Sequence, residues 1–190
     1  TFARNPNFRH LSAFFSGISR IASSAFTGSA LDTVDLDYNQ LTEYNREAFD
    51  VIGATLERLF LGDNQISSLP SGAFNNLGRV EVLNIANNPI GNPPVDAFNS
   101  MVNLATLIMH DCQIHELDPL QFQGLNSLKD LRLAGNHLTN LPDGLFNQLW
   151  NLTEIDLDRN QLYTLSAATF GTSVSTIRYL FAWFNNIFGI

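Results

Sequence analysis

Three residues of types that bind zinc occur within six positions of this chain, at His110, Cys112 and His115. Imidazole nitrogen and thiolate sulfur are preferred zinc ligands, and a structural zinc site gathers about four of them around one ion. Such a site forms only where the ligand atoms point toward one centre. The zinc hypothesis therefore depends on the elements that carry these three side chains.

Other chemistry has less support in the sequence. No serine, histidine and acid follow a pattern that indicates a catalytic triad, and neither GxGxxG nor GxxxxGK[ST] occurs. One N-glycosylation sequon, Asn151-Leu152-Thr153, predicts a glycan acceptor at Asn151 in a secreted chain. We therefore expect no enzymatic activity and no cofactor.

Seven phenylalanines recur along the chain with spacings of 23, 25, 24, 24, 24 and 24 residues. They are Phe26, Phe49, Phe74, Phe98, Phe122, Phe146 and Phe170. A constant period of this length indicates a repeat protein, in which one small unit stacks on the next. The place of a residue in the period therefore predicts the side of the stack on which it lies.

Each unit opens with a version of the pattern LxxLxLxxNxL, clearest in Leu56, Leu59, Leu61, Asn64 and Ile66. With the first apolar residue as place 1, the units begin at Phe8, Leu31, Leu56, Val80, Leu104, Leu128, Leu152 and Ile177. The alternation at places 4 to 6 predicts a short strand, and units of one direction predict parallel pairing. Places 1, 4, 6 and 11 are then expected to point into the core.

This pattern resembles the leucine-rich repeat over residues 8–190. The pairs Leu69-Pro70 and Leu141-Pro142 and the ending from Phe74 to Leu77 are similar to the extracellular animal class. That class includes Toll-type receptors, Slit-like guidance proteins, lamprey variable lymphocyte receptors and insect leucine-rich immune proteins. The resemblance implies one α/β-type repeat solenoid over residues 1–190, curved as a horseshoe. Its concave face would carry the parallel sheet, and its convex face short 3-10 or irregular segments.

The same resemblance implies a non-enzymatic module that binds a protein through its concave face. It also implies a secreted or cell-surface protein with a receptor role or a role in innate immunity. Extracellular members of the class carry cysteine-rich caps on their terminal coils, whereas this chain has one cysteine, Cys112. We therefore expect the sequence to be a piece of a longer ectodomain whose caps lie elsewhere.

Place 9 is asparagine in six units: Asn39, Asn64, Asn88, Asn136, Asn160 and Asn185. An amide there can both donate to and accept from backbone groups where the strand ends. Ser16 and Cys112 replace it in two units, and each can still donate one hydrogen bond. The same register places His110 on the strand face, Cys112 in the core and His115 beyond the turn, so the zinc ligands diverge and no metal site is expected.

The chain has a formal net charge of −8 and a pI near 4.7. An acidic surface disfavours non-specific binding to nucleic acids and to anionic membranes. No apolar run has the length of a membrane-spanning helix, so we expect no direct membrane insertion of this segment.

Acids and aromatic residues gather on the predicted concave face of the first four units. The acids are Asp32, Asp35, Asp37, Glu57, Asp63 and Glu81, opposed across the second to fourth units by one base, Arg58. The aromatic residues beside them are Phe14, Phe15, Tyr38 and Phe60. Charge steers encounters and rings supply buried area, so the pattern predicts a basic protein or peptide ligand. A solvated acidic face without a ligand is the alternative.

The last unit places four aromatic residues on the same face: Tyr179, Phe181, Trp183 and Phe184. Large rings left in water are unusual and indicate a contact surface. Chain beyond Ile190 could cover them, or a ligand or a homo- or heterodimer partner could. The alternative function is therefore an assembly module of an extracellular matrix or complex that dimerises through aromatic ends.

Overall fold

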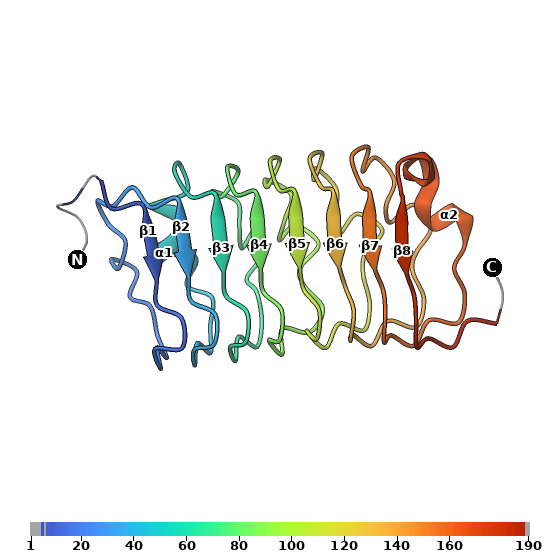
Figure 1. Ribbon diagram of the computed structural model, residues 1–190, viewed down its shortest axis with the longest axis horizontal. Helices are drawn as coiled ribbons and strands as arrows, with labels where there is room; N and C mark the ends of the chain where they lie inside the picture. Colours follow the sequence, from blue (N-terminus) through green and yellow to red (C-terminus); the bar gives the residue numbers. More distant parts are fainter. Residues whose placement is uncertain (1–4, 6, 189–190) are drawn as a thin grey trace.

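The computed structural model describes residue 5 and residues 7–188, and within them eight short strands form one parallel sheet. The strands follow one another from β1 to β8 along an elongated stack (Figure 1). They are β1 (His10–Ser12), β2 (Thr33–Asp35), β3 (Arg58–Phe60), β4 (Val82–Asn84), β5 (Thr106–Ile108), β6 (Asp130–Arg132), β7 (Glu154–Asp156) and β8 (Tyr179–Phe181). Each strand occupies places 3 to 5 of its unit, so the predicted repeat solenoid is confirmed.

The strands pair in a constant register that aligns the same place of neighbouring units. Leu59 pairs with Leu83, Leu83 with Leu107, and Leu107 with Leu131. All four side chains are fully buried. Because every coil repeats the same inward places, these leucines form one continuous column of core through the stack.

The periodic phenylalanines fill the opposite side of the core. All seven are buried, and neighbouring rings pack with centroids 5.5 Å apart for Phe26 and Phe49 and 5.7 Å apart for Phe74 and Phe98. Tyr44 joins this column between the two pairs, 5.2 Å from Phe49 and 4.8 Å from Phe74. The sequence period identified the phenylalanines but not Tyr44, which occurs in only one coil.

The chain returns from one strand to the next mostly through turns. Three short helices interrupt them: α1 (Arg46–Asp50), α2 (Ala167–Phe170) and the 3-10 helix η1 (Gly171–Ser175). The hydroxyl of Ser166 accepts a hydrogen bond from the backbone N–H of Ala168 and caps α2. The predicted 3-10 and irregular segments are present, and two single-turn α-helices are added to them.

Inner coils are covered on both sides, whereas the two end coils are covered on one. Leu180 of β8 is 39% exposed, although its counterpart Ile155 in β7 is fully buried. Leu11 of β1 is likewise only half-buried. Among the described residues, no helix combines the length and apolar character needed to cross a membrane.

Candidate functional site

The residue at place 8 of each unit adopts a left-handed backbone conformation at the end of its strand. In seven units this residue is not glycine: Phe15, Tyr38, Asp63, Asn87, Asp111, Arg159 and Phe184, with φ between 50° and 57°. Bulky residues rarely adopt positive φ, which costs roughly 1–2 kcal/mol per residue. The fold therefore imposes this conformation, and it sets three large aromatic rings, Phe15, Tyr38 and Phe184, at the edge of the sheet.

The first aromatic group consists of Phe14, Phe15 and Tyr38. The rings of Phe14 and Tyr38 come from adjacent coils and pack at a tilt with centroids 5.0 Å apart. All three side chains stay exposed, at 53%, 78% and 48%. The contact between Phe14 and Tyr38 places these two rings on one surface. We name the three residues the N-terminal aromatic patch, and their role in ligand binding stays a prediction.

The acids Asp35 and Asp37 are less available to a ligand than the sequence suggested. The carboxylate of Asp35 accepts hydrogen bonds from the Ser12 hydroxyl at 3.0 Å and from the backbone N–H of Asp37 at 3.1 Å. Both acids are only partly exposed. Part of their hydrogen-bonding capacity therefore holds the sheet edge together, and their predicted role in ligand binding stays a prediction.

Asp37 has the most contacts of the predicted acids. Its carboxylate accepts from the backbone N–H of Gly62 at 2.6 Å and from the Asn84 amide at 3.1 Å, so it links three consecutive coils. Burial raises the pKa of Asp37, and the negative charges of Asp35 and Asp63 raise it further. A Cβ at Gly62 would lie 2.6 Å from the Asn84 amide nitrogen, so a side chain there would displace Asn84 from its contact with Asp37.

The same arrangement recurs near the other end of the sheet. The backbone N–H of Asp158 donates to Asp156 at 3.0 Å, and that of Trp183 donates to Asp158 at 2.6 Å. Both pairs have the sequence Asp-Leu-Asp at places 5 to 7. This repeated tripeptide was a sequence signal for a structural role, and reading the acids only as charge missed it.

Two further predicted residues contribute to the surface beside the N-terminal aromatic patch. Phe60 is half-buried on β3, and Asp63 is half-buried at the turn that follows. Within residues 7–188 no hydrogen bond or ion pair engages the Asp63 carboxylate, whereas Glu57 pairs with Arg79 at 3.6 Å. The carboxylate oxygens of Asp63 are therefore available to a ligand.

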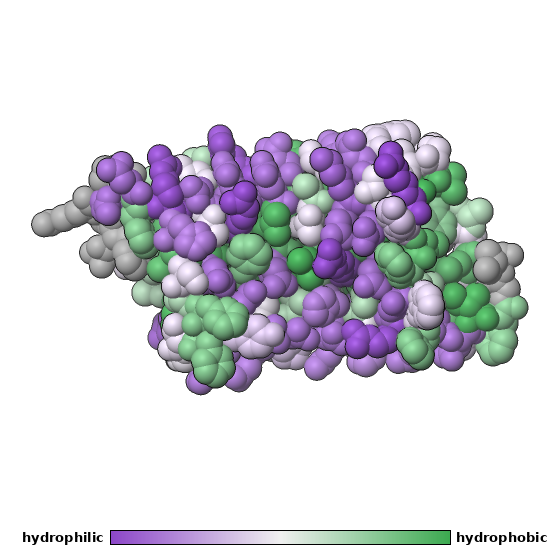
Figure 2. All heavy atoms as spheres, viewed as in Figure 1, coloured by the Kyte–Doolittle hydropathy of each residue, from purple (hydrophilic) through white to green (hydrophobic). Residues whose placement is uncertain are grey.

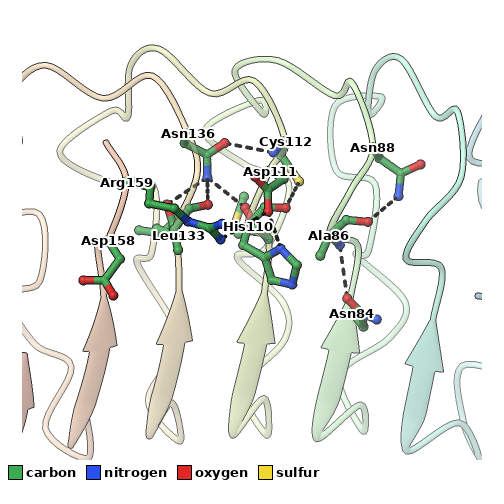
Figure 3. A network of polar contacts seen from close by, with 12 residues as sticks. Asn84, Ala86, Asn88, His110, Asp111, Cys112, Leu133, Asn136, Asp158 and Arg159 are labelled. Carbon is green, nitrogen blue, oxygen red and sulfur yellow. Dashed lines mark hydrogen bonds and ion pairs between the residues drawn. The ribbon is translucent and has the colours of Figure 1, made fainter. Parts of the chain in front are cut away.

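Charged groups pair with one another farther along the face. Arg132 donates to Asp130 at 2.8 Å, and this hydrogen bond raises the pKa of Arg132. His110 Nδ1 lies 2.8 Å from Asp111, and the Arg159 guanidinium approaches the same carboxylate at 3.8 Å (Figure 3). This half of the face is thus more nearly neutralised than the half that carries the N-terminal aromatic patch.

The residues of the zinc hypothesis lie apart from one another. Cys112 is fully buried, and its thiol donates to the carbonyl oxygen of Ile85 at 3.3 Å (Figure 3 shows its place beside Asn136). Burial raises the pKa of Cys112 to about 12, so the thiol remains protonated. His110 contacts Asp111, whereas His115 packs against His137 from the next coil. Cys112 therefore replaces the asparagine of its rung, as its place in the period predicted.

The aromatic residues of the last coil form a second exposed group. Tyr179, Phe181, Trp183 and Phe184 are 58%, 37%, 69% and 80% exposed. The rings of Tyr179 and Phe181 stack with centroids 6.5 Å apart. Figure 2 shows hydrophobic residues gathered toward both ends of the face and a largely hydrophilic stretch between them.

The sequon asparagine has a structural contact. Asn151 is exposed, and its amide donates to the carbonyl oxygen of Asn126 in the preceding coil at 2.7 Å. Asn103 makes the equivalent bond to Gly78 at 2.8 Å without being part of a sequon. A glycan on Asn151 would have to be accommodated together with this inter-coil contact.

Known protein structures share the fold along nearly the whole chain. TLR13, solved as a TLR13–ssRNA13 complex, superposes with a TM-score of 0.79 and 26% identity over 96% of this chain and 24% of its own. An internalin (inlF) from Listeria monocytogenes superposes with a TM-score of 0.75 and 19% identity over 95% of this chain and 49% of its own. A leucine-rich repeat protein from Leptospira interrogans superposes with a TM-score of 0.75 and 23% identity over 94% of this chain and 44% of its own. The chain thus spans about a quarter of TLR13 and just under half of the two bacterial proteins.

A search of curated proteins finds no match. The family model described as "Leucine rich repeat" matches four overlapping segments, residues 54–114, 79–138, 102–162 and 127–187. These matches cover most of the chain and coincide with the coils of the solenoid. The sequence period, the parallel sheet and the family match agree, and the chain belongs to the leucine-rich repeat family.

Proposed function

We propose that this protein is a non-enzymatic recognition module that binds a basic protein or peptide through the N-terminal half of its strand face. The leucine-rich repeat fold typically serves protein–protein interaction, and the geometry favours that use here. The strands hold the binding side chains on a backbone that is ordered before the partner arrives. Little affinity is then lost to ordering loops on binding.

The observation that carries this proposal is the N-terminal aromatic patch beside an available acid. Phe14 and Tyr38 already pack together, and Phe15 is 78% exposed. Asp63 follows one coil later at the same place of the repeat as Tyr38. Tyr and Trp are enriched among the few residues that carry most of the binding energy at protein interfaces, and a complementary charge at the rim raises the rate of association.

The sign of the charge selects among macromolecular partners. TLR13 was solved in a complex with ssRNA13, but this chain carries a net charge of −8. Nucleic-acid binding depends on Lys and Arg side chains that neutralise phosphates. On β2 and β3, the base Arg58 lies among acids such as Asp35. A basic protein segment fits this face better than RNA does.

We also propose the biological setting. Similarity to TLR13 at 26% identity supports an extracellular recognition protein, secreted or on the cell surface, in innate immunity or as a receptor. Asn151 would be its glycosylation site, because the side chain is exposed. Mass spectrometry of the chain secreted from animal cells tests this setting. A chain that is secreted without a glycan on Asn151 would contradict the assignment of that site.

Selection from a library of random 12-residue peptides tests the function directly. Binders should be enriched in Arg, Lys and aromatic residues, and the affinity of a selected peptide should fall with rising salt. Phe14→Ala and Tyr38→Ala should each weaken that peptide by about tenfold, as expected for loss of an aromatic contact residue. Asp63→Lys should weaken it mainly by slowing association.

Glu116→Lys provides a control with the same change of charge at an exposed residue of the turn after β5. It should leave the affinity unchanged. Selection of acidic peptides would contradict the proposal, as would equal effects of Glu116→Lys and Asp63→Lys. Tight binding of a single-stranded oligoribonucleotide that Asp63→Lys leaves unaltered would refute the assignment of a protein partner.

The second candidate function is assembly through the last coil, favoured by the exposure of Tyr179, Trp183 and Phe184. Light scattering across a range of concentrations tests it, because a dimer that buries Trp183 would dissociate on dilution and in Trp183→Ser. Trp150→Ser is a matched control, since Trp150 is 54% exposed on a different part of the solenoid. A monomer at every concentration would eliminate assembly as a function of this chain alone.

A further inference from the structure

Two histidines from neighbouring coils meet on the edge of the solenoid, away from the strand face. The rings of His115 and His137 lie with centroids 4.8 Å apart and planes inclined by 47°. Both line a shallow depression together with Glu116, Thr139 and Gln161. Neither ring is buried: His115 is exposed and His137 half-buried.

The backbone around both histidines is held in place. The Asn92 side chain accepts hydrogen bonds from the backbone N–H groups of His115 at 2.8 Å and Glu116 at 3.0 Å. The backbone N–H of His137 donates to the carbonyl oxygen of Ile114 at 2.8 Å. The spacing of the two backbones is therefore set by coil stacking, and from this spacing the two rings reach each other.

This separation is compatible with two imidazoles that bind the same metal ion. A metal–nitrogen distance of about 2.0–2.1 Å and a tetrahedral angle place the two ring centres roughly 5 Å apart. Imidazole suits late first-row divalent ions, and carboxylate and water can complete their coordination. Glu116, on the rim of the same depression, adds negative charge beside the pair.

Gln161 supplies the outer contact that metal-binding histidines usually have. Its side-chain amide lies 3.4 Å from His137 Nδ1. When the other ring nitrogen, Nε2, binds a metal, Nδ1 carries the proton and donates it. The Gln161 carbonyl oxygen can accept that hydrogen bond after the amide rotates, which would fix the orientation of the ring.

We propose that His115 and His137 form a two-histidine site for a late first-row divalent metal ion such as Cu²⁺, Ni²⁺ or Zn²⁺. Water completes the coordination, and Glu116 on the rim adds negative charge without acting as a third ligand. No group of three or more His, Cys, Asp or Glu residues in the described part of the chain is arranged for a metal, so the site is open and exchangeable. The ion would join two adjacent coils and leave the strand face free for a protein partner.

Isothermal titration of the chain without a polyhistidine tag, with Ni²⁺ and with Zn²⁺, tests the proposal. We expect one equivalent to bind, and His115→Asn or His137→Asn to weaken binding by about tenfold or more through loss of one of two imidazoles. Electron paramagnetic resonance of the Cu²⁺ form should show two coupled imidazole nitrogens in the native chain and one in either variant. Far-UV circular dichroism checks that the variants, both at solvent-accessible positions, stay folded.

His110→Asn is the matched control, because His110 lies on the strand face and contacts Asp111 instead. It should leave the affinity unchanged. Absence of binding by the native chain would overturn the proposal. Metal affinity that is unchanged in the double variant His115→Asn/His137→Asn would also overturn it. An equal loss of metal affinity in His110→Asn would do the same.

Discussion

Replacing Asn136 by alanine should destabilise the solenoid far more than replacing Cys112, the residue at the same place one coil earlier. The Asn136 side chain is 2% exposed and makes five hydrogen bonds to backbone groups. Its oxygen accepts from the N–H groups of Cys112 and Ile114, both at 3.0 Å. Its nitrogen donates to three carbonyl oxygens in its own and the preceding coil.

The cost depends on which of these backbone groups keep another partner. The carbonyl of Leu133 still accepts from Asn160, and the carbonyl of Ala134 from the backbone of Asp111. The N–H groups of Cys112 and Ile114 and the carbonyl of Met109 lose the only partner observed for them in the described chain. Each unsatisfied buried group costs about 1–3 kcal/mol, so the three together cost roughly 3–9 kcal/mol.

Cys112→Ala provides the comparison within one fold. The thiol donates to the carbonyls of Ile85 and His110, and these keep Asn88 and the backbone of Asn87 as donors. Only the volume of the sulfur is lost, which costs about 1 kcal/mol.

Urea unfolding followed by circular dichroism measures both variants, and hydrogen exchange locates the loss, because repeat arrays do not always unfold in one step. Exchange should accelerate first in β5 and β6 of Asn136→Ala. If the two variants differed by less than about 1 kcal/mol, the hydrogen-bond accounting would be wrong.

Three further outcomes follow from individual contacts. Gly135→Ala should lower the melting temperature more than Gly91→Ala. Both glycines have positive φ, but only at Gly135 would a Cβ meet a side chain, the Asp111 carboxylate. Equal losses in the two variants would exclude the clash. The raised pKa of Asp37 means that its neutral form favours folding below the unfolded value of 3.8, and this contribution is lost as pH rises through the folded pKa. Asp37→Asn should therefore gain stability relative to the native chain between about pH 3 and pH 7 in urea midpoints, and a gain of the same size at every pH would contradict the burial argument. The Cys112 thiol, with a pKa near 12 and no exposure, should react with a thiol reagent only at the rate of local opening, and immediate reaction in the native chain would refute its burial.

The period alone predicted the strands, the core and the asparagine rungs, because every coil repeats the same inward places. The phenylalanine column and the role of Cys112 follow from that repetition. The period did not predict Tyr44 or the helices α1 and α2. Each depends on how one coil is filled and therefore does not recur with the period.

The candidate site was predicted less completely. Phe14 and Tyr38 pack together, because their places in the repeat face outward and adjacent coils bring them into contact. The assignment of Asp35 and Asp37 to ligand binding stays a prediction, and net charge did not reveal that their oxygens accept hydrogen bonds from the sheet edge. Two copies of Asp-Leu-Asp were the signal that could have identified this role.

The sequence by itself determined the class of fold and the face on which each residue lies, because those depend only on a period of about two dozen residues repeated along the chain. Tertiary structure decided which side chains meet. Asp37 and Asn84 are 47 residues apart, and His115 and His137 come from different coils. Their contacts depend on the stacking distance and rotation between coils, which the order of the residues does not specify.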